Sequence, residues 1–286
     1  MQDKTSETLL PGVERLMSEL TTFSNGEASR AASDHLESGG KRVRARLALN
    51  ASTSLGLSPI KSIAIAAACE LIHNASLIHD DIHDKSETRR GKAATWARFG
   101  SGTAICAGDL LISAAYAAIA RTQSASMPQL LTQTHRRVAE VISGQCEDLL
   151  AQSTDSLSLD LYETIAKSKS APLLALPVEL ALIEAGHQQA SEQVGYAADA
   201  FALAYQIADD IEDISNDIIQ GQPNIISVLG GQNASSSQGE QARQIAVENY
   251  RLAAHFANQL PRGSGSLLSA YARKGLATIL PVGEAA

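Results

Sequence analysis

Apolar residues recur three and four positions apart along most of this chain, which is the spacing of one face of an α-helix. In the first such segment the apolar positions are Leu9, Val13, Leu16, Met17 and Leu20. Segments of this kind, separated by glycine, proline and polar breaks, predict helices over residues 8–20, 31–36, 59–84, 102–121, 127–152, 157–169, 172–185, 191–217 and 238–260. Alternating patterns that would predict β-strands are scarce.

Composition supports an all-α fold. Alanine is abundant, and the eight prolines leave long gaps, from Pro59 to Pro128 and from Pro177 to Pro223, that suit long helices. Hydrophobic residues make up 44% of the 286 residues, which is enough for a large core, and no linker or internal repeat divides the chain. We therefore expect a single domain over residues 1–286.

Charge and cysteine content narrow the function. The formal net charge of −8 argues against a nucleic-acid binder, because phosphate backbones are bound by basic surfaces. The three cysteines, Cys69, Cys106 and Cys146, have no zinc-ligand or disulfide spacing. The N-terminus does not read as a signal peptide, and no uncharged apolar run reaches the roughly 18 residues of a membrane span. These features predict a cytoplasmic protein without a membrane span.

The helix predicted over residues 59–84 ends in an acidic stripe. At about 100° per residue, His73, Asp80 and Asp84 fall on one stripe, with Asp81 beside them. The opposite side of this helix is apolar and consists of Ile60, Ala64, Ala67, Leu71, Ile78 and Ile82. The helix is therefore expected to have a core-facing back and a functional front.

A second predicted helix repeats this acidic pattern. In YQIADDIED, residues 205–213, Gln206, Asp209, Asp210 and Asp213 share one face, again with the spacing DDxxD. A single copy could arise by chance on a solvated helix face. Like charges one turn apart repel, however, and two copies are better explained by bound cations.

The residue types indicate which ligands to expect. Carboxylates without nearby paired cysteines suit a hard cation such as Mg²⁺, which also binds water and substrate phosphate oxygens. The ligand spacing and central glycine of an EF-hand are absent. Arginine and lysine, which bind phosphate oxygens, follow a Gly-Gly pair and the first acidic motif, at Lys41, Arg42, Arg44, Arg46, Arg89, Arg90 and Lys92. We expect a phosphorylated ligand, although GGKRVRAR alone could be a solvated loop and is not a Walker A motif.

Together these segments resemble the trans-isoprenyl (polyprenyl) diphosphate synthase family. The chain contains, in the family's order, GGKRVRA, ELIHNASLIHDDIHD, ETRRGKAAT, GDLL, GQCEDL, KSKSA and YQIADDIED. The resemblance covers roughly residues 36–230. It implies a bundle of long antiparallel helices around a central cavity, paired as a homodimer, with Mg²⁺ as cofactor.

The resemblance also implies roles for particular residues. The expected metal ligands are Asp80, Asp81, Asp84, Asp209, Asp210 and Asp213. The positions that match a site for isopentenyl diphosphate are Gly40, Lys41, Arg44, His73 and Arg90. Arg89 and Lys169 match ligands of the allylic diphosphate, and with Ser170 and Gln206 they are the expected catalytic residues. Gln145 and Gln206 match positions that line the cavity, whereas His79 and His83 match no position with a known role.

The implied activity is condensation of isopentenyl diphosphate with an allylic diphosphate to give a farnesyl, geranylgeranyl or longer trans-prenyl diphosphate. Two departures are Ala45, where the family usually has proline, and the absence of lysine from ISNDIIQGQPNIISVLGG, residues 214–231. Asn216, Asn224 or a partner residue could compensate for the missing lysines. A class I terpene cyclase, an atypical prenyl coupling enzyme and a non-catalytic subunit of a heteromeric synthase remain alternatives. The retained isopentenyl diphosphate residues disfavour the cyclase, and two complete DDxxD motifs disfavour the inert subunit.

Product length depends on the residues below the first motif. Ser76 and Ala75, four and five places before Asp80, are not aromatic. Cys69 lies roughly 16 Å below Asp80 at the rise of an α-helix. We therefore expect a pocket that admits a chain of geranylgeranyl size or longer, unless another helix closes it, for which Tyr116 is a candidate.

Overall fold

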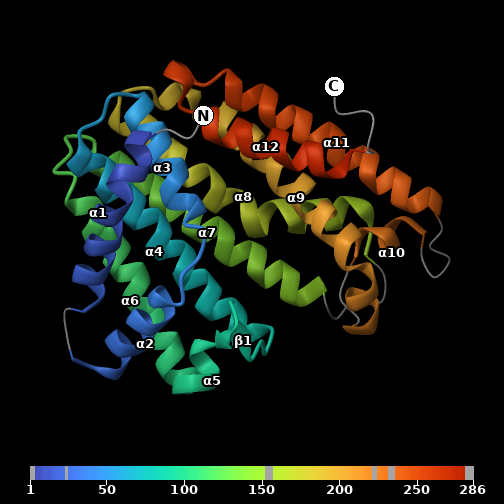
Figure 1. Cartoon of the computed structure of the whole chain (residues 1–286), viewed down its shortest axis with the longest axis horizontal. Helices are drawn as coiled ribbons and strands as arrows, with labels where there is room; N and C mark the ends of the chain where they lie inside the picture. Colours follow the sequence, from blue (N-terminus) through green and yellow to red (C-terminus); the bar gives the residue numbers. More distant parts are fainter. Residues whose placement is uncertain (1–3, 23–24, 152–156, 221–223, 231–235, 281–286) are drawn as a thin grey trace. The chain divides into compact units, whose positions relative to one another are not determined.

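The structure is a computed structural model that describes residues 4–22, 25–151, 157–220, 224–230 and 236–280 (Figure 1). In these residues the regular elements are α-helices, apart from two short 3-10 segments and a two-stranded hairpin. The all-α prediction is therefore confirmed. Packing divides the chain into two compact units, which we describe separately, and the expectation of a single domain stays a prediction.

The first unit comprises residues 1–134 and 176–188. Helix α4 packs against α1, α3 and α6 (Figure 1). The elements of this unit are α1 (Lys4–Thr21), α2 (Glu27–Glu37), α3 (Val43–Ser54), α4 (Pro59–His83), β1 (Thr88–Arg89), β2 (Lys92–Ala93), α5 (Thr95–Phe99) and α6 (Ser101–Ala120), with the start of α7 (Met127–Ala151) and the end of α8 (Leu159–Glu184).

Helix α4 carries several site residues, and local sequence explains its bounds. Pro59 occupies the first turn, where its missing N–H costs nothing, and the Ser58 hydroxyl accepts a hydrogen bond from Lys61 N–H at 3.5 Å. The predicted apolar side is buried or half-buried except Ile60, which is 70% exposed because it lies in the first turn, before the helix enters the core. Asp84 follows the last turn as its C-cap.

Helices α4 and α6 are each long and apolar enough to cross a membrane by length and composition. In this fold 72% of the apolar window of α4 and 44% of that of α6 are buried. A core helix meets the same two criteria, and α4 is such a helix. The expectation of no membrane span stays a prediction.

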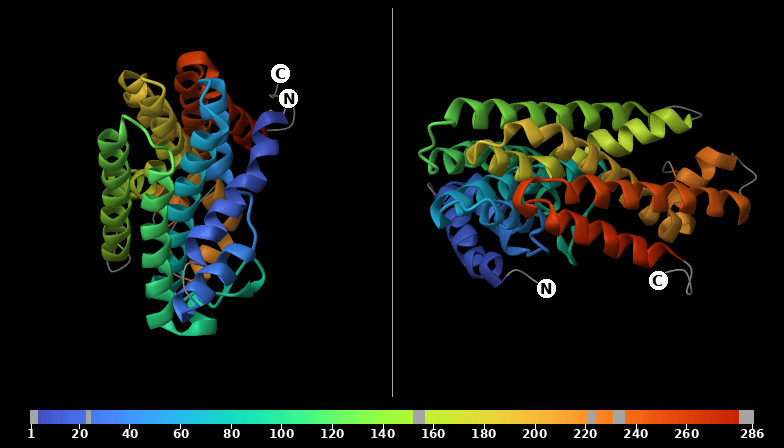
Figure 2. Two further views of the ribbon diagram at one scale, coloured as in Figure 1. Left: turned by 90° about the vertical axis from the view of Figure 1, so that its left-hand side faces the viewer. Right: turned by 90° about the horizontal axis from the view of Figure 1, so that it is seen from above.

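The second unit comprises residues 135–175 and 189–286. Helix α11 packs against α9 and α12, and the right-hand view of Figure 2 shows α11 and α12 side by side. The elements are the remaining parts of α7 and α8, η1 (Gln188–Ala190), α9 (Ser191–Gln220), α10 (Ile225–Gly230), α11 (Ser236–Asn258), η2 (Pro261–Gly263) and α12 (Ser266–Ile279). A buried cluster that includes Tyr162, Leu203, Ile225 and Ala242 joins α8, α9, α10 and α11.

Several elements differ from the sequence prediction. Two helices were expected over residues 157–169 and 172–185, but α8 is one helix that passes through Pro172. Residues 171–183 are all buried, and this packing outweighs the backbone hydrogen bond that proline cannot donate. Helices α3, α5, α10 and α12 and the β1–β2 hairpin were not predicted. Arg90 and Gly91, with φ of 53° and 75°, form the two-residue turn of the hairpin.

Candidate functional site

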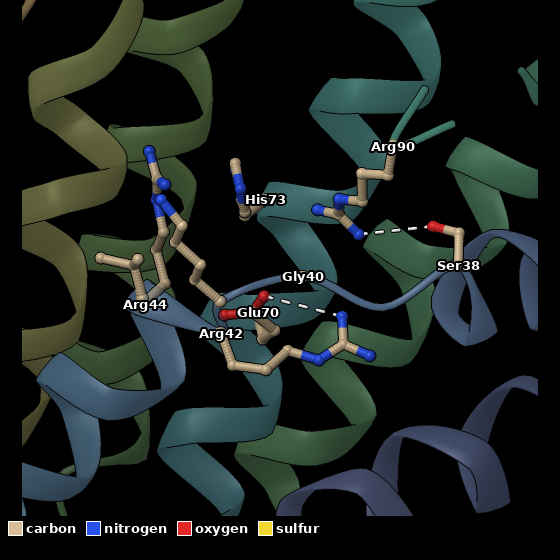
Figure 3. Close-up of a pocket in the computed structure, with 9 residues that line it drawn as sticks. Ser38, Gly40, Arg42, Arg44, Glu70, His73 and Arg90 are labelled. Carbon is tan, nitrogen blue, oxygen red and sulfur yellow. Dashed lines mark hydrogen bonds and ion pairs between the residues drawn. The ribbon is translucent and has the colours of Figure 1, made fainter. Parts of the chain in front are cut away.

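A pocket of about 440 Å³ lies in the first unit, where the chain between α2 and α3 passes α4 (Figure 3). Its lining is Ser38, Gly40, Lys41, Arg42, Val43, Arg44, Glu70, His73 and Arg90. These nine residues include all five positions that were matched to an isopentenyl diphosphate site. The fold thus brings together residues that are up to 50 positions apart in the sequence.

Arg90 reaches this pocket from the tip of the hairpin (Figure 3). Its Nη1 donates to the Gly39 carbonyl and lies 3.4 Å from the Ser38 hydroxyl. Its guanidinium group lies against Gly40, where an added Cβ would come within 2.8 Å of the guanidinium carbon. Gly40 also has a φ of 131°, which side chains disfavour. Glycine is therefore required here so that the arginine can approach the backbone.

His73 points into the pocket beside Arg44 and Arg90 (Figure 3). Burial, followed by the positive charges of Arg44 and Arg90, holds the pKa of His73 well below its usual range. Nearby His35 is also buried, and its Nδ1 lies 3.3 Å from the Thr95 hydroxyl. Burial, with Arg90 and Arg89, lowers the pKa of His35 to about 4. Both imidazoles are neutral at pH 7, so the pocket's positive charge comes from its lysine and arginine side chains.

Glu70 was not predicted as a site residue, and Arg42 only as part of a basic segment. Arg42 Nη1 lies 3.9 Å from Glu70 Oε1, and both side chains are buried. A signal for Glu70 was present in the sequence, since it is the only charged residue in the apolar run 62–72. A buried carboxylate needs a protein partner. A lone glutamate in an apolar helix therefore predicts an ion pair with a basic residue elsewhere in the chain.

The three aspartates of the first motif lie in different environments. Asp80 is half-exposed and Asp84 is exposed. Asp81 is fully buried, and Arg89 Nε donates to its two carboxylate oxygens at 2.7 and 2.9 Å. Arg89 Nη2 lies 2.6 Å from Asp81 Oδ1. The expected allylic diphosphate ligand Arg89 is therefore held by the middle aspartate of the motif.

The second motif repeats this arrangement in the second unit. Asp209 and Asp213 are exposed, whereas Asp210 is 2% exposed. One carboxylate oxygen of Asp210 accepts from the Tyr162 hydroxyl at 2.7 Å and from Ile225 N–H at 2.8 Å. The other oxygen accepts from Gln206 Nε2 at 2.7 Å. Gln206, expected to line the cavity, is thus bound to the aspartate one turn later, and Tyr162 is a contributor that no local motif indicated.

The segment after the second motif is fixed to the same aspartate. Asn224 is fully buried, donates from Nδ2 to the Asp210 carbonyl at 2.7 Å and accepts from Ile226 N–H at 2.9 Å. These bonds engage both polar groups of the Asn224 side chain with the backbone. Compensation for the missing lysines by Asn224 stays a prediction. The side chain of Asn216 lies outside the described residues.

The remaining predicted residues are on α7 and α8 in the second unit. Lys169 Nζ lies 2.8 Å from Asp148 Oδ2, and both side chains are partly buried. Gln145 is 8% exposed, and Ser170 is half-buried. Asp148 was not predicted, although it lies three residues after Gln145 and therefore near it on the helix surface.

The outer aspartates have the donor chemistry that a hard cation requires. Asp80 and Asp84 are one helical turn apart, as are Asp209 and Asp213. Within the described residues, no group of three His, Cys, Asp or Glu side chains is arranged to hold a metal ion. A cation at either pair would therefore need further oxygens from water or substrate phosphate, which is how Mg²⁺ usually binds.

The residues expected to set product length lie along α4 and α6 of the first unit. Ala75 is buried, and Ser76 is half-buried with its hydroxyl donating to the His73 carbonyl at 2.8 Å. Cys69 is buried lower on α4, and Tyr116 on α6 is half-buried. The absence of an aromatic side chain directly below the first motif thus stays the basis of the length prediction.

Long helices that carry two acidic motifs, with a cationic pocket in the first unit, define an isoprenoid synthase-type protein. The polyprenyl synthetase family model matches residues 26–248, and the chain belongs to this family. A solved geranylgeranyl pyrophosphate synthetase from the archaeon Geoglobus acetivorans superposes with a TM-score of 0.82 at 25% identity, covering 96% of this chain and 99% of that one.

Curated relatives agree with this assignment. The chain is 30% identical over 245 residues to a short chain isoprenyl diphosphate synthase of Methanothermobacter thermautotrophicus, covering 81% of this chain and 75% of the relative. It is 29% identical over 225 residues to an octaprenyl diphosphate synthase of Haemophilus influenzae, covering 74% and 67%. The prediction of a prenyl transferase is therefore confirmed, whereas the relatives differ in the chain length that their names give.

Proposed function

We propose that this protein condenses isopentenyl diphosphate with an allylic diphosphate, with Mg²⁺ as cofactor, to give a trans-prenyl diphosphate. The observation that carries the proposal is the shared pocket of Gly40, Lys41, Arg44, His73 and Arg90. A diphosphate needs several cationic donors in a concave site, and arginine guanidinium groups pair with its oxygens. This pocket is a site for isopentenyl diphosphate, which a cyclase would not need.

The allylic diphosphate is assigned to the acidic motifs. Asp80, Asp84, Asp209 and Asp213 would hold the metal ions there, which is supported by the half-exposed position of Asp80 and the exposed positions of the other three. Asp81 and Asp210, also expected as ligands, instead fix the surrounding side chains, which is supported by their burial and their bonds to Arg89 and to Tyr162 and Gln206. When bound, Mg²⁺ would neutralise the charge that develops on the departing pyrophosphate.

The chain's own residues assist the three chemical stages. Arg89 and Lys169 donate to the pyrophosphate as the allylic C–O bond breaks, while Ser170, Gln145 and Gln206 line the cavity around the carbon chain. The double bond of isopentenyl diphosphate then forms the new C–C bond with the allylic carbon. Loss of a proton to the released pyrophosphate restores a double bond, so no histidine base is required.

We further propose that two copies pair through α6 and that the enzyme is cytoplasmic. Support for pairing comes from the apolar character of α6 together with its exposed Ile105, Cys106, Ala117 and Ala120. An exposed apolar helix face is typical of an interface. Light scattering at micromolar concentration should give twice the chain mass, and Ile105→Glu should reduce it; a monomeric native protein would contradict the pairing.

The activity is tested with purified protein, Mg²⁺ and geranyl or farnesyl diphosphate, with and without isopentenyl diphosphate. The expected product is a longer diphosphate that forms only when both substrates are present. Hydrocarbon or alcohol formed without isopentenyl diphosphate would instead identify a cyclase. Absence of turnover by the purified chain, with activity restored by a second subunit, would identify a heteromeric partner.

A further inference from the structure

Arg42 is one of the residues that line the cationic pocket (Figure 3), and its side chain connects three helices of the first unit. Its side chain is 8% exposed. Nε and Nη2 donate to the Glu14 carboxylate on α1 at 2.7 and 3.2 Å. Nη2 also donates to the Leu36 carbonyl, in the last turn of α2, at 2.7 Å. Together with Glu70 on α4, 3.9 Å away, these contacts use the planar guanidinium as a brace between helices.

Glu70 is the carboxylate partner in this arrangement, with its side chain 2% exposed. Its Oε2 accepts from Ala45 N–H, in the first turn of α3, at 3.0 Å, and its Oε1 lies 3.4 Å from Asn74 Nδ2. A carboxylate repels phosphate oxygens, so Glu70 does not bind a diphosphate in the adjoining pocket. Its position there is explained by the protein groups that it holds.

The backbone of Arg42 requires such support. Its φ of 49° and ψ of 44° are left-handed, a conformation that is unfavourable for a residue with a side chain. Residues persist in such conformations only where their surroundings fix them. Lys41 and Arg44 line the pocket on either side of Arg42 in the sequence. The backbone turn at Arg42 therefore determines the positions of their Cα atoms and the directions in which their side chains leave the backbone.

The Gly39 carbonyl extends this support to Arg90. Arg42 Nη1 lies 3.4 Å from that oxygen, and Arg90 Nη1 donates to the same oxygen. Displacement of the turn would therefore also displace a group that holds Arg90 above Gly40.

We propose that Arg42 and Glu70 are positioning residues for the diphosphate of isopentenyl diphosphate. Although both line the pocket, their charged groups bind protein partners rather than substrate. They fix the segment 38–45 so that Lys41, Arg44 and Arg90 converge on one ligand. The choice of ligand rests on the proposed function. The expected signature is selective, because the allylic diphosphate binds at residues that this segment does not hold.

The test compares Arg42→Gln and Glu70→Gln with the control Arg98→Gln, which removes a surface ion pair to Asp34 in the same unit. Calorimetry with isopentenyl diphosphate alone should show affinity reduced about tenfold or more in Arg42→Gln and in Glu70→Gln, here called the brace variants. The affinity of the control should be unchanged. The KM for isopentenyl diphosphate should rise by a similar factor, with little change in the KM for the allylic substrate. Wild-type affinity in both brace variants, or an equal rise in both KM values, would overturn the proposal.

Hydrogen exchange tests the brace without any ligand. Glu70→Leu removes the acceptor of Ala45 N–H, so exchange at Ala45 should accelerate about tenfold or more, whereas Glu70→Gln, which retains an acceptor oxygen, should give a smaller change. Unchanged exchange at Ala45 in folded Glu70→Leu protein would overturn the positioning role. If native protein bound no isopentenyl diphosphate, the proposed function would fail, and this exchange measurement would still decide the role of the brace.

Discussion

Arg89 and Asp81 form an ion pair in the first unit, in which Arg89 Nε lies 2.7 and 2.9 Å from the two carboxylate oxygens of Asp81. Asp210 in the second unit is likewise buried and bonded to protein donors. In each DDxxD motif the middle aspartate therefore holds protein groups in place, while the outer two are more exposed. Substitution of an outer aspartate should therefore reduce catalysis, whereas substitution of a middle aspartate should reduce stability.

Replacing an outer aspartate should abolish turnover without unfolding the protein. Asp80→Ala or Asp209→Ala removes a proposed cation ligand from an accessible position, so we expect kcat to fall by about 10³-fold or more with unchanged helix content. Steady-state kinetics with a Mg²⁺ titration, and far-UV circular dichroism, measure both effects. Near-normal rates in these variants would refute the metal assignment.

Replacing a middle aspartate should primarily reduce stability. Asp81→Asn leaves the partly buried Arg89 without its anionic partner, and loss of one member of such a pair costs about 3 kcal/mol. Thermal and urea unfolding should show this loss, whereas Asp84→Asn, at an exposed position, serves as the control. Equal stability of the two variants would contradict the structural role of Asp81.

Stability should decline with acid because of His35. Burial and nearby arginines lower its pKa from 6.5 to about 4, so between these values the unfolded chain binds more protons than the folded one. The contribution of His35 to the free energy of unfolding is complete above about pH 6.5 and is lost as pH falls toward 4. The free energy of unfolding should differ by about 3 kcal/mol between these limits. Urea unfolding across this range should show a smaller pH dependence in His35→Gln; identical curves would exclude His35 as the cause.

Binding of isopentenyl diphosphate should be coupled to proton uptake by His73. Its pKa is held well below the usual range by burial and by Arg44 and Arg90, and a bound diphosphate would offset those positive charges and raise it. Affinity should therefore increase as pH falls toward 6. Calorimetry in two buffers with different ionisation enthalpies measures the uptake, and His73→Gln isolates the ligand's own protonation. An uptake that is the same in both proteins would assign it to the ligand alone.

Product length should respond to Ser76. A phenylalanine at this half-buried position on α4 would add bulk below the first motif, so Ser76→Phe should shorten the product by one or more five-carbon units. Chromatography of dephosphorylated products measures the change, with Ser76→Ala as the size-matched control. An unchanged distribution would show that the floor of the pocket lies elsewhere.

Local sequence was sufficient to predict most of the long helices and both acidic stripes. Helical spacing predicted α4 to within one residue of its end, and the DDxxD pattern showed that the aspartates share a face. It could not separate the middle aspartates from the outer ones. Their burial depends on Arg89 in strand β1 of the hairpin and on Tyr162, which is 48 residues from Asp210.

Two further features depend on tertiary packing and could not be predicted from local sequence patterns. Pro172 was read as a helix start, but a fully buried run carries α8 through it. Glu70 was passed over because one charge in an apolar helix has no local partner; Arg42, its partner, is on the segment before α3. The resemblance to a family supplied the pocket residues, and the fold then showed five of them lining one cavity.

The central claim is that carbon–oxygen cleavage is coupled to addition of isopentenyl diphosphate. The most direct measurement is the rate of pyrophosphate release with Mg²⁺ and an allylic diphosphate, recorded with and without carbon-14-labelled isopentenyl diphosphate. We expect release to require both substrates and to equal, mole for mole, the labelled five-carbon units found in the product. Release at the same rate without isopentenyl diphosphate, or without label in a longer diphosphate, would contradict this function.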